Sequence, residues 1–416
     1  MRRTTSLAAL SCAAFLTVSC GGSGGDPAGT QPSGTPTTTA ATTAATSAAP
    51  AAPAAVASAA PAAVSSAAPA AEKVVATQVA TGLRSPWGLA FLPDGRALVT
   101  EKGGTLRIVS LDGAVSAPIG GGPAVDTNGQ GGLLDVKLSP DFANDSTIWF
   151  AFAEPAGGGF VRTAVARAVL RPSELESVQV VFRQQPAITG GLHFGARLAF
   201  APDGTLFVGL GERGQGTPAQ ALDNHLGKVV RIRPDGSVPA DNPFVGRAGA
   251  LPEIWSYGHR NIQGAAIEPS SGRLWIVEHG PQGGDEVNVP DASANHGWPE
   301  ITYGRDYSTG EPLGQGTTRA DVAPPLHYWV PTSIAPAGIA FVTSSRVPAW
   351  TGDLFVGALA GRMLVRLDVQ DGRVVGEQRL LTSLGERIRD VKQGPDGALY
   401  FVTDSTDGRL MRVDVR

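Results

Sequence analysis

A histidine and a glutamate lie at the two ends of one apolar stretch of the chain. His193 precedes an apolar run, and Glu212 follows the next run. If the two runs form a hairpin, Glu212 approaches His193 and can fix the tautomer of its imidazole through one ring nitrogen. A histidine held in this way is a candidate general base, because its pKa lies near neutral pH. The alternative is a structural histidine ahead of a strand.

Two pairs of polar residues suit an anionic or oxygen-rich ligand. Arg260 and Asn261 are adjacent in a glycine-bounded loop, where a guanidinium fork beside an amide fits a planar oxyanion or carboxylate. Arg387 and Arg389 are two residues apart, so on a strand both side chains point to the same face. Two neighbouring cations repel each other unless an anion lies between them. A solvated turn and a surface stripe are the alternative interpretations.

A third segment, 278–288, is rich in glycine and contains Glu278, Asp285 and Glu286, and His296 follows soon after. Calcium prefers carboxylates together with backbone carbonyls, and this segment offers both. Zinc is less suited, because no histidine pair has the helical spacing of four residues. The alternative is an acidic turn without a metal.

The elements that must position these residues form a repeat. An apolar run, a turn containing Pro, Asp or Gly and a second apolar run recur six times, at 88–100, 136–150, 198–208, 265–276, 339–356 and 391–402. Each copy predicts a β-hairpin, because Pro presets φ and Gly tolerates positive φ in the turn. Six hairpins at a spacing of roughly 45–75 residues indicate a repeat architecture. We therefore predict an all-β fold, a six-bladed β-propeller of four-stranded antiparallel blades. A jelly roll or sandwich does not explain six equivalent hairpins.

The N-terminal part of the chain differs in composition from this body. Residues 1–20 resemble a signal peptide of the lipoprotein type, with Arg2 and Arg3 before a short apolar stretch and small residues before Cys20. Residues 21–73 are rich in Ala, Pro, Thr and Ser and predict a disordered linker. Residues 74–416 form the propeller. We expect an exported protein, periplasmic or on the cell surface, with a lipid anchor at Cys20; plain secretion is the alternative.

Bulk properties exclude several classes of function. The formal net charge of -4 lacks the basic bias of a nucleic-acid binder. Both cysteines, Cys12 and Cys20, lie in the leader. The body therefore has no internal disulfide, cysteine nucleophile or cysteine-ligated metal.

The motifs, taken in order, resemble those of the soluble PQQ-dependent aldose sugar dehydrogenases, in the soluble quinoprotein glucose dehydrogenase family. The segments that carry the resemblance are 128–134, 193–198, 258–264, 278–286, 295–299 and 387–397. The family has a six-bladed propeller, which agrees with the repeat count. The resemblance implies that pyrroloquinoline quinone (PQQ), a planar tricarboxylate o-quinone, lies over the mouth of the channel.

The resemblance also assigns roles to individual residues. It implies that His193, oriented by Glu212, takes the proton of the anomeric hydroxyl, that the C1 hydride passes to PQQ, and that calcium and Arg260 stabilise the developing oxyanion. The product is the lactone, and electrons pass to an external cytochrome or quinone-type acceptor. The implied cofactor-binding residues are Gln130, Arg260, Asn261, Tyr307, Ala358, Ala360, Arg387 and Arg389. The carbonyls of Gly280 and Pro281 match ligands of a calcium at PQQ, and Glu286 with the carbonyl of His296 matches a second calcium.

The sequence departs from the family at two positions. Ala360 stands where glucose dehydrogenase has a lysine that contacts PQQ, and Arg362 is a neighbouring cation able to replace it. Leu192 replaces a polar residue before the histidine, which predicts a less polar sugar pocket. Two other functions remain as alternatives, a tethered binding module and a metal-dependent lactonase. Arg387 and Arg389 argue against the lactonase, because a lactone carries no charge.

Overall fold

The structure is a computed structural model that describes residues 73–344 and 347–416. The predicted leader, its Cys20 and residues 21–72 of the predicted linker lie outside the described residues. No helix in the described part is both long enough and apolar enough to cross a membrane.

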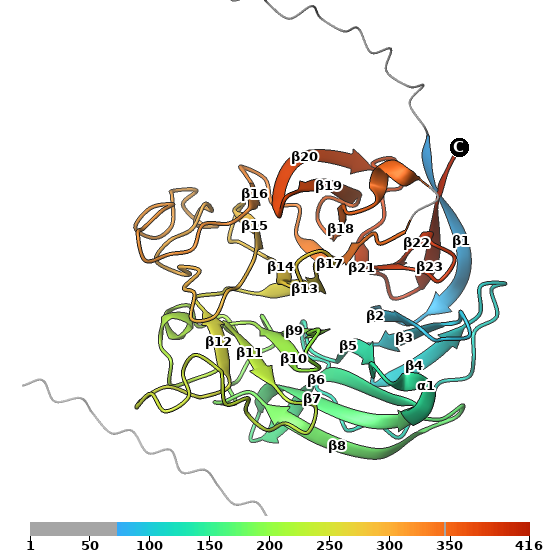
Figure 1. Ribbon diagram of the computed structural model, residues 1–416, viewed down its shortest axis with the longest axis horizontal. Coiled ribbons are helices and arrows are strands. Elements are labelled where there is room, and N and C mark those ends of the chain that lie inside the picture. Colours follow the sequence, from blue (N-terminus) through green and yellow to red (C-terminus); the bar gives the residue numbers. More distant parts are fainter. Residues whose placement is uncertain (1–72, 345–346) are drawn as a thin grey trace, which may run out of the picture. The chain divides into compact units, whose positions relative to one another are not determined.

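Six antiparallel sheets stand around one central axis (Figure 1). Their innermost strands, β2, β5, β9, β13, β17 and β21, each contact the innermost strand of the next sheet, and β21 returns to β2. The prediction of a six-bladed propeller is confirmed. Five sheets have four strands; the sheet of blade 1 has three, and Ile119 extends its outer edge by a bridge to Leu106.

The bounds of the strands follow the blades. Blade 1 comprises β2 (Pro86–Phe91), β3 (Ala97–Glu101) and β4 (Thr105–Val109); blade 2 comprises β5 (Leu133–Leu138), β6 (Thr147–Gly157), β7 (Phe160–Leu170) and β8 (Leu175–Arg183). Blade 3 comprises β9 (Gly195–Phe200), β10 (Leu206–Leu210), β11 (Lys228–Ile232) and β12 (Ile254–Tyr257); blade 4 comprises β13 (Ile262–Ile267), β14 (Leu274–Glu278), β15 (Asp285–Asn288) and β16 (His327–Trp329). Blade 5 comprises β17 (Pro336–Phe341), β18 (Leu354–Ala358), β19 (Leu364–Gln370) and β20 (Arg373–Leu380); blade 6 comprises β21 (Ile388–Gln393), β22 (Leu399–Thr403), β23 (Gly408–Val415) and β1 (Val74–Leu83). The described helices are all short: α1 (Phe142–Asp145) and two 3₁₀ helices, Thr217–Gln220 and Pro348–Trp350.

The six predicted hairpins are the two innermost strands of the six blades. In the copies with Pro-Asp-Gly, the glycine has positive φ, at +89° in Gly95, +81° in Gly204 and +76° in Gly397. A residue with a Cβ is strained there, so the turn chemistry fixes the hairpins.

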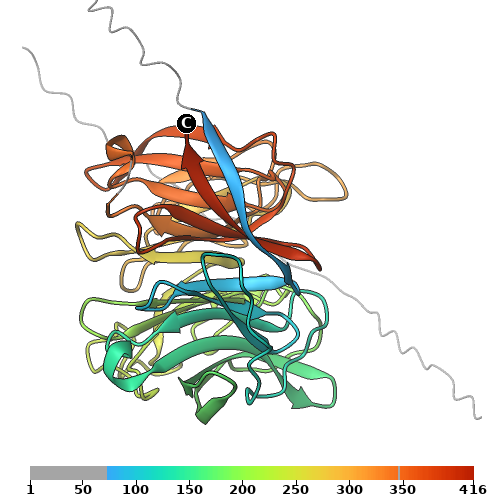
Figure 2. The same ribbon diagram turned by 90° about the vertical axis from the view of Figure 1, so that its right-hand side faces the viewer.

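The ring closes by pairing of its first and last strands. β1 runs antiparallel to β23, from the pair Val74↔Val415 to the pair Leu83↔Gly408. Figure 2 shows the two strands side by side, β1 in blue and β23 in dark red. The described residues contain no cysteine, so hydrogen bonds and packing hold this closure.

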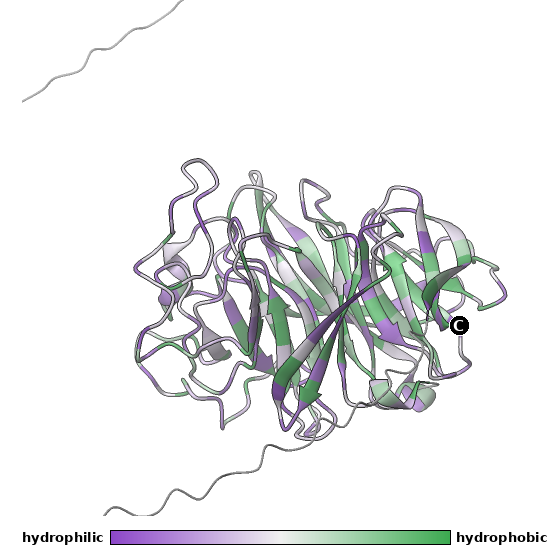
Figure 3. Cartoon of the chain, turned by 90° about the horizontal axis from the view of Figure 1, so that it is seen from above, coloured by the Kyte–Doolittle hydropathy of each residue, from purple (hydrophilic) through white to green (hydrophobic). Residues whose placement is uncertain are grey.

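Apolar side chains fill the spaces between blades, and Figure 3 shows hydrophobic segments concentrated in the strands. Between blades 1 and 2, for example, Leu98 and Ile108 belong to one buried cluster with Phe150 and Phe152. Face-to-face packing of this kind gives each blade two covered faces, so strands such as β3 are buried along their whole length.

The third residue of every innermost strand is either glycine or charged. The glycines allow close approach: a Cβ on Gly264 would lie 2.3 Å from the carbonyl oxygen of Ala337 on the next blade. The glycines are Gly88, Gly264 and Gly338, and the charged residues are Asp135, Arg197 and Asp390.

The three charged residues meet across the central channel. Arg197 Nη1 lies 3.3 Å from an oxygen of Asp135 and 3.2 Å from an oxygen of Asp390. All three side chains are at most 1% exposed. Arg197 also donates through Nε to the carbonyl of Gln263 at 2.6 Å and through Nη2 to the carbonyl of Arg389 at 3.1 Å. One guanidinium therefore connects β5, β9, β13 and β21.

We predict that Arg197→Met lowers the free energy of unfolding by about 3–5 kcal/mol, because it leaves the buried Asp135 without its cation and Asp390 with Lys392 alone. Urea denaturation measures the effect. The matched control is Arg171→Met, which removes an ion pair whose two side chains are about half exposed and should cost about 0–1 kcal/mol. Equal effects of the two changes would contradict the proposed importance of Arg197.

Candidate active site

The predicted site residues come from separate blades but lie at one end of the propeller. In an antiparallel blade, the start of the innermost strand and the end of the second strand lie at the same end. Gln130, His193, Arg260 and Arg387 precede innermost strands, whereas Glu212 follows the second strand of its blade. Glu278, at the end of β14, and Asp404, directly after β22, reach the same end.

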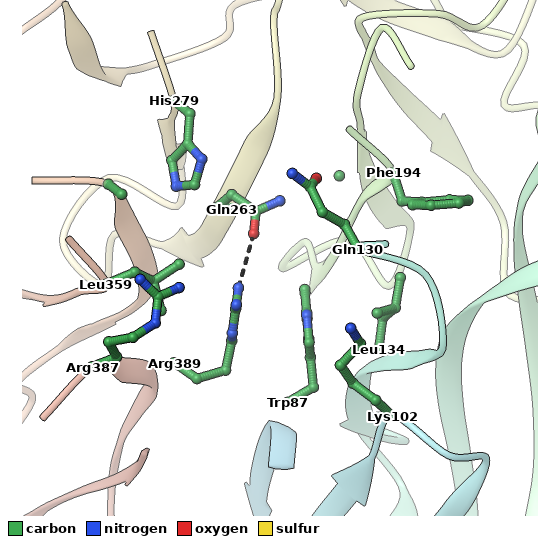
Figure 4. A pocket seen from close by; sticks show the side chains of 12 residues that line it. Trp87, Lys102, Gln130, Leu134, Phe194, Gln263, His279, Leu359, Arg387 and Arg389 are labelled. Atoms are coloured by element: carbon green, nitrogen blue, oxygen red, sulfur yellow. Dashed lines mark hydrogen bonds between the residues drawn. The ribbon is translucent and has the colours of Figure 1, made fainter. Parts of the chain in front are cut away.

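A cavity of about 170 Å³ opens there, on the channel axis. Four of its lining residues, Trp87, Leu134, Gln263 and Arg389, are the second residues of β2, β5, β13 and β21. They stand next to the glycines and charged residues described above. The other lining residues are Gly195, the first residue of β9, and seven residues of the surrounding loops: Lys102, Gln130, Phe194, His279, Ala335, Leu359 and Arg387 (Figure 4).

The structure brings His193 and Glu212 together as predicted. His193 Nδ1 is hydrogen-bonded to one oxygen of Glu212, and the other oxygen accepts from the backbone N of Gly216 at 2.6 Å. Within residues 73–344 and 347–416, Nε2 of His193 has no hydrogen-bond partner. Burial disfavours the charged form of Glu212, but the hydrogen bonds from His193 and Gly216 outweigh it and lower its pKa. A carboxylate therefore fixes one ring nitrogen and leaves the other available as a base.

The backbone around His193 is also constrained. Its φ of +48° lies in the left-handed region, which costs energy for a residue with a Cβ. Its backbone N donates to the side-chain oxygen of Gln130 at 2.8 Å, and this contact ties the histidine to the loop before β5. The side chain is only 12% exposed, so its direction is set by its surroundings.

Arg260 and Asn261 each present a buried nitrogen without an acceptor. The backbone N of Arg260 donates to Glu278 at 2.7 Å, and its Nη1 donates to the carbonyl of His279 at 3.2 Å. The amide oxygen of Asn261 accepts from the backbone N of Gly195 and from Gln263. Nε of Arg260 and Nδ2 of Asn261, however, are buried and find no partner in the described residues. Buried donors normally have acceptors, so these two suit the oxygen atoms of a ligand.

Asp404 lies between the two predicted arginines. It accepts from Nε of Arg387 at 2.7 Å and from Nη2 of Arg389 at 2.9 Å, while Nη1 of Arg389 donates to Gln263 at 3.2 Å. Burial opposes ionisation of Asp404, but the two arginines outweigh it and lower its pKa. The protein thus supplies one anion for two cations, and the trio keeps one positive charge toward the cavity.

The acidic segment forms a second polar cluster beside the cavity. Glu278 accepts from the His259 ring and from Asn288, both at 2.9 Å, and Asn288 also donates to Glu286 at 2.9 Å. Burial and the neighbouring Glu278 raise the pKa of Glu286 to about 8. The His296 ring stacks on His259 with centroids 4.5 Å apart, and burial lowers its pKa to about 3.

The donor chemistry of this cluster decides how a metal would be held. In the described part of the chain, no three His, Cys, Asp or Glu side chains are placed to hold a metal ion. Backbone oxygens would therefore have to complete any calcium site around Glu286. Gly280 and Pro281 are both buried beside it, and the backbone N of Gly280 is held by Asp285 at 3.0 Å.

Five predicted cofactor residues are not on the cavity wall: Arg260 and Asn261, described above, and Tyr307, Ala358 and Ala360. Tyr307 lies in the loop between β15 and β16 and is 69% exposed. Ala358 is fully buried at the end of β18, and Ala360 is exposed; the intervening Leu359 lines the cavity. Arg362 is exposed and its Nη1 approaches the carbonyl of Gly385 at 3.4 Å, so this cation is not directed to the cavity wall.

Sequence reasoning did not single out Lys102, Trp87, Gln263, His279 or Asp404. Alignment of the six repeats would have exposed Trp87 and Gln263, because each occupies the second position of an innermost strand. Lys102 and Asp404 directly follow second strands, as Glu212 nearly does. The position just after a second strand, which these residues share, is the sequence signal that could have identified Lys102 and Asp404.

The chain is similar to known proteins over almost the whole propeller. The family described as Glucose / Sorbosone dehydrogenase matches residues 83–412, almost the whole propeller. The chain belongs to this family. Its members, as dehydrogenases, are oxidoreductases.

Several relatives of the family resemble the chain over most of their length. Aldose sugar dehydrogenase YliI of Escherichia coli is 45% identical over 338 residues, which cover 80% of this chain and 91% of that protein. A crystal structure of a glucose dehydrogenase superposes with a TM-score of 0.80 at 48% identity, over 82% of this chain and 99% of the other. The PQQ-bound aldose sugar dehydrogenase of Streptomyces coelicolor has a TM-score of 0.68 at 30% identity, over 83% and 99% of the two chains.

We predict that Asp404→Asn destabilises the protein at pH 7 by about 1.5–3 kcal/mol, because charge-assisted hydrogen bonds are lost and two arginines then repel. The ordinary pKa of the carboxyl is 3.8, and the folded state lowers it. Asp404 therefore stabilises the fold above this pH, and the effect is lost as pH falls through the folded pKa. Denaturation at several pH values should show that the difference between the two proteins shrinks below about pH 4. A difference independent of pH would contradict the assignment.

Proposed function

We propose that this protein oxidises the anomeric C1 hydroxyl of aldose sugars to the lactone, with PQQ as cofactor and calcium as its metal, and passes the electrons to an external acceptor. The observation that carries the proposal is the convergence, at the cavity end of the propeller, of a carboxylate-oriented histidine and an excess of cationic and unpartnered donor groups. Family membership supports the same reaction class, since the relatives are named glucose and aldose sugar dehydrogenases.

The residues around the cavity suit a planar polyanion. Trp87 contributes an aromatic ring to the cavity wall, and Arg387 and Arg389 offer guanidinium groups that bind carboxylates. The unpartnered nitrogens of Arg260 and Asn261 are suited to quinone oxygens. These groups would hold PQQ without a covalent bond.

When bound, PQQ supplies an o-quinone that accepts a hydride equivalent from C1 of the sugar. His193 acts as the general base: its free Nε2 accepts the proton of the anomeric hydroxyl, while Glu212 stabilises the imidazolium that forms. Arg260, a fixed cation, stabilises negative charge that develops on oxygen. The sugar loses two electrons and two protons in total and leaves as the lactone.

Calcium is proposed at the acidic segment. The carbonyls of Gly280 and Pro281 would hold one ion beside the cofactor, and Glu286 with the carbonyl of His296 would hold a second. A buried carboxylate whose pKa is raised to about 8 lacks a compensating cation, and calcium is a cation that oxygen ligands of this kind bind.

The leader supports an export proposal. Cys20 would carry the lipid anchor of an exported, periplasmic or cell-surface protein, and residues 21–73 would tether the propeller. The electron acceptor would be a cytochrome or a quinone-type carrier.

The deciding experiment is reconstitution of the purified protein with PQQ and Ca²⁺, followed by addition of glucose or other aldoses. We predict that the sugar bleaches the absorption band of the quinone and that an artificial acceptor restores it. His193→Ala should still bind PQQ but oxidise sugar at a rate on the order of 100- to 10,000-fold lower, because it removes the base. Wild-type protein that neither binds PQQ at micromolar concentration nor bleaches it would overturn the proposal. Hydrolysis of a lactone without PQQ would instead support the lactonase.

Calcium removal gives an independent test of the metal. We predict that the free energy of unfolding is about 2.7 kcal/mol lower in EDTA than at a calcium concentration 100-fold above the dissociation constant. In Glu286→Gln, part of the calcium-dependent gain should disappear. The control Asp112→Asn changes an exposed acid in a distant turn and should retain the full gain. An identical response of wild type and Glu286→Gln would exclude Glu286 as a ligand.

A further inference from the structure

We infer that Lys102 supplies the third cation of the cofactor site and pairs with a carboxylate of PQQ. The inference rests on the proposed function, and it assigns to blade 1 a contact that glucose dehydrogenase makes from blade 5, at the position of Ala360.

Lys102 lies on the far wall of the cavity from the two arginines. It directly follows β3, whereas Arg387 and Arg389 come from the start of β21. Figure 4 shows Trp87 between Arg389 and Lys102, with the ammonium group of Lys102 directed into the cavity. A flat ligand over Trp87 would therefore have cations on two sides. This arrangement suits a molecule whose carboxylates project in different directions.

The ammonium group of Lys102 has no anionic partner. Its Nζ donates to the carbonyl of Gly129 at 2.9 Å, and within the described residues it forms no ion pair. Burial and the positive charge of Arg389 lower its pKa, with a smaller opposing effect of Asp404. A cation placed in this way gains from an anion in the cavity, because the anion relieves both the desolvation and the repulsion.

The cations of blade 5 do not fill this role. Ala360 has no charge, and Arg362 is exposed and approaches the carbonyl of Gly385 instead of the cavity. Asp404 already neutralises one of the two arginines of blade 6. A tricarboxylate would thus face one net positive charge from blade 6, and Lys102 adds a second.

Lys102 also reaches the catalytic histidine through two contacts. It holds the carbonyl of Gly129, and the next residue, Gln130, accepts from the backbone N of His193 at 2.8 Å. A change at Lys102 could therefore act through its charge or through this loop, and the test has to separate the two effects.

The experiment titrates the apo form of the full chain with PQQ and follows the quenching of tryptophan fluorescence, with Trp87 as the nearest reporter. Four variants are compared: Lys102→Met removes charge and hydrogen bond, Lys102→Gln keeps a donor for Gly129 without charge, Lys102→Arg keeps the charge, and Lys73→Met is the control. Lys73 is exposed at the start of the propeller. Thermal unfolding of every variant confirms that it is folded at the temperature of the titration.

We expect Lys102→Met and Lys102→Gln to weaken PQQ binding by roughly 10- to 100-fold, the range typical of a lost charge-assisted contact. Lys102→Arg and Lys73→Met should bind nearly as wild type does. The loss should be smaller at high salt, which screens the pair. Ala360→Lys added to Lys102→Met should restore part of the affinity by returning a cation from blade 5.

The outcomes separate the two proposals. Wild-type protein that does not bind PQQ overturns the proposed function together with this inference. If the wild-type protein binds PQQ and Lys102→Met binds it with equal affinity, only the inference is overturned. If Lys102→Gln binds PQQ with normal affinity and Lys102→Met binds it more weakly, the lysine acts by holding the loop at Gly129. That result also overturns its role as a cation. If Lys102→Met does not fold, the comparison of Lys102→Gln with Lys102→Arg decides the question in the same way.

Discussion

The interaction of Arg197 with Asp135 and Asp390 is the constraint on which the site depends. Charges removed from water must be compensated by partners in a fixed geometry, or the fold loses several kilocalories per mole. Here a single guanidinium contacts two carboxylates and two backbone carbonyls, and Lys392 also pairs with Asp390 at 2.7 Å. The three residues occupy the third position of their strands, and the cavity is lined from the second position. Any shift that breaks the ion pairs therefore also moves the floor of the cavity.

In the remaining three blades, a glycine at the same strand position allows the innermost strands to pack closely. Where an innermost strand carries no charge at its third position, it carries Gly88, Gly264 or Gly338, and the neighbouring blade approaches to a distance that a Cβ would obstruct. Close packing and charge pairing are thus both used around one ring. The strands thus hold the blades together, which leaves the loops at one end free to carry polar groups.

Much of the fold could be predicted from the sequence because the determinants are local. Three of the six turns are Pro-Asp-Gly and specify their hairpins by backbone conformation, and the six repeated hairpins specify the number of blades. The pairing of His193 with Glu212 was predictable for the same reason, since both flank one hairpin. The roles of Lys102 and Arg197 were not predictable, because they arise only when separate blades meet. Asp404 flanks the same hairpin as Arg387 and Arg389, so its position after the second strand could have identified it. Calcium ligands that are backbone carbonyls leave no signal in side-chain types, so the segment around Gly280 could be proposed only from its acids and its resemblance.

The closure of the ring also determines where this domain can be joined to another polypeptide. β1 ends at Leu83, next to the start of β2 at the cavity end, so it begins at the opposite end of the propeller. Its first residues pair with the last residues of the chain: Lys73 and Arg416 exchange two backbone hydrogen bonds, of 2.8 and 3.0 Å. The two ends of the domain are therefore neighbours on the face away from the cavity. A short peptide could join them, and a circularly permuted chain opened in a loop on that same face would keep every blade and leave the mouth unobstructed.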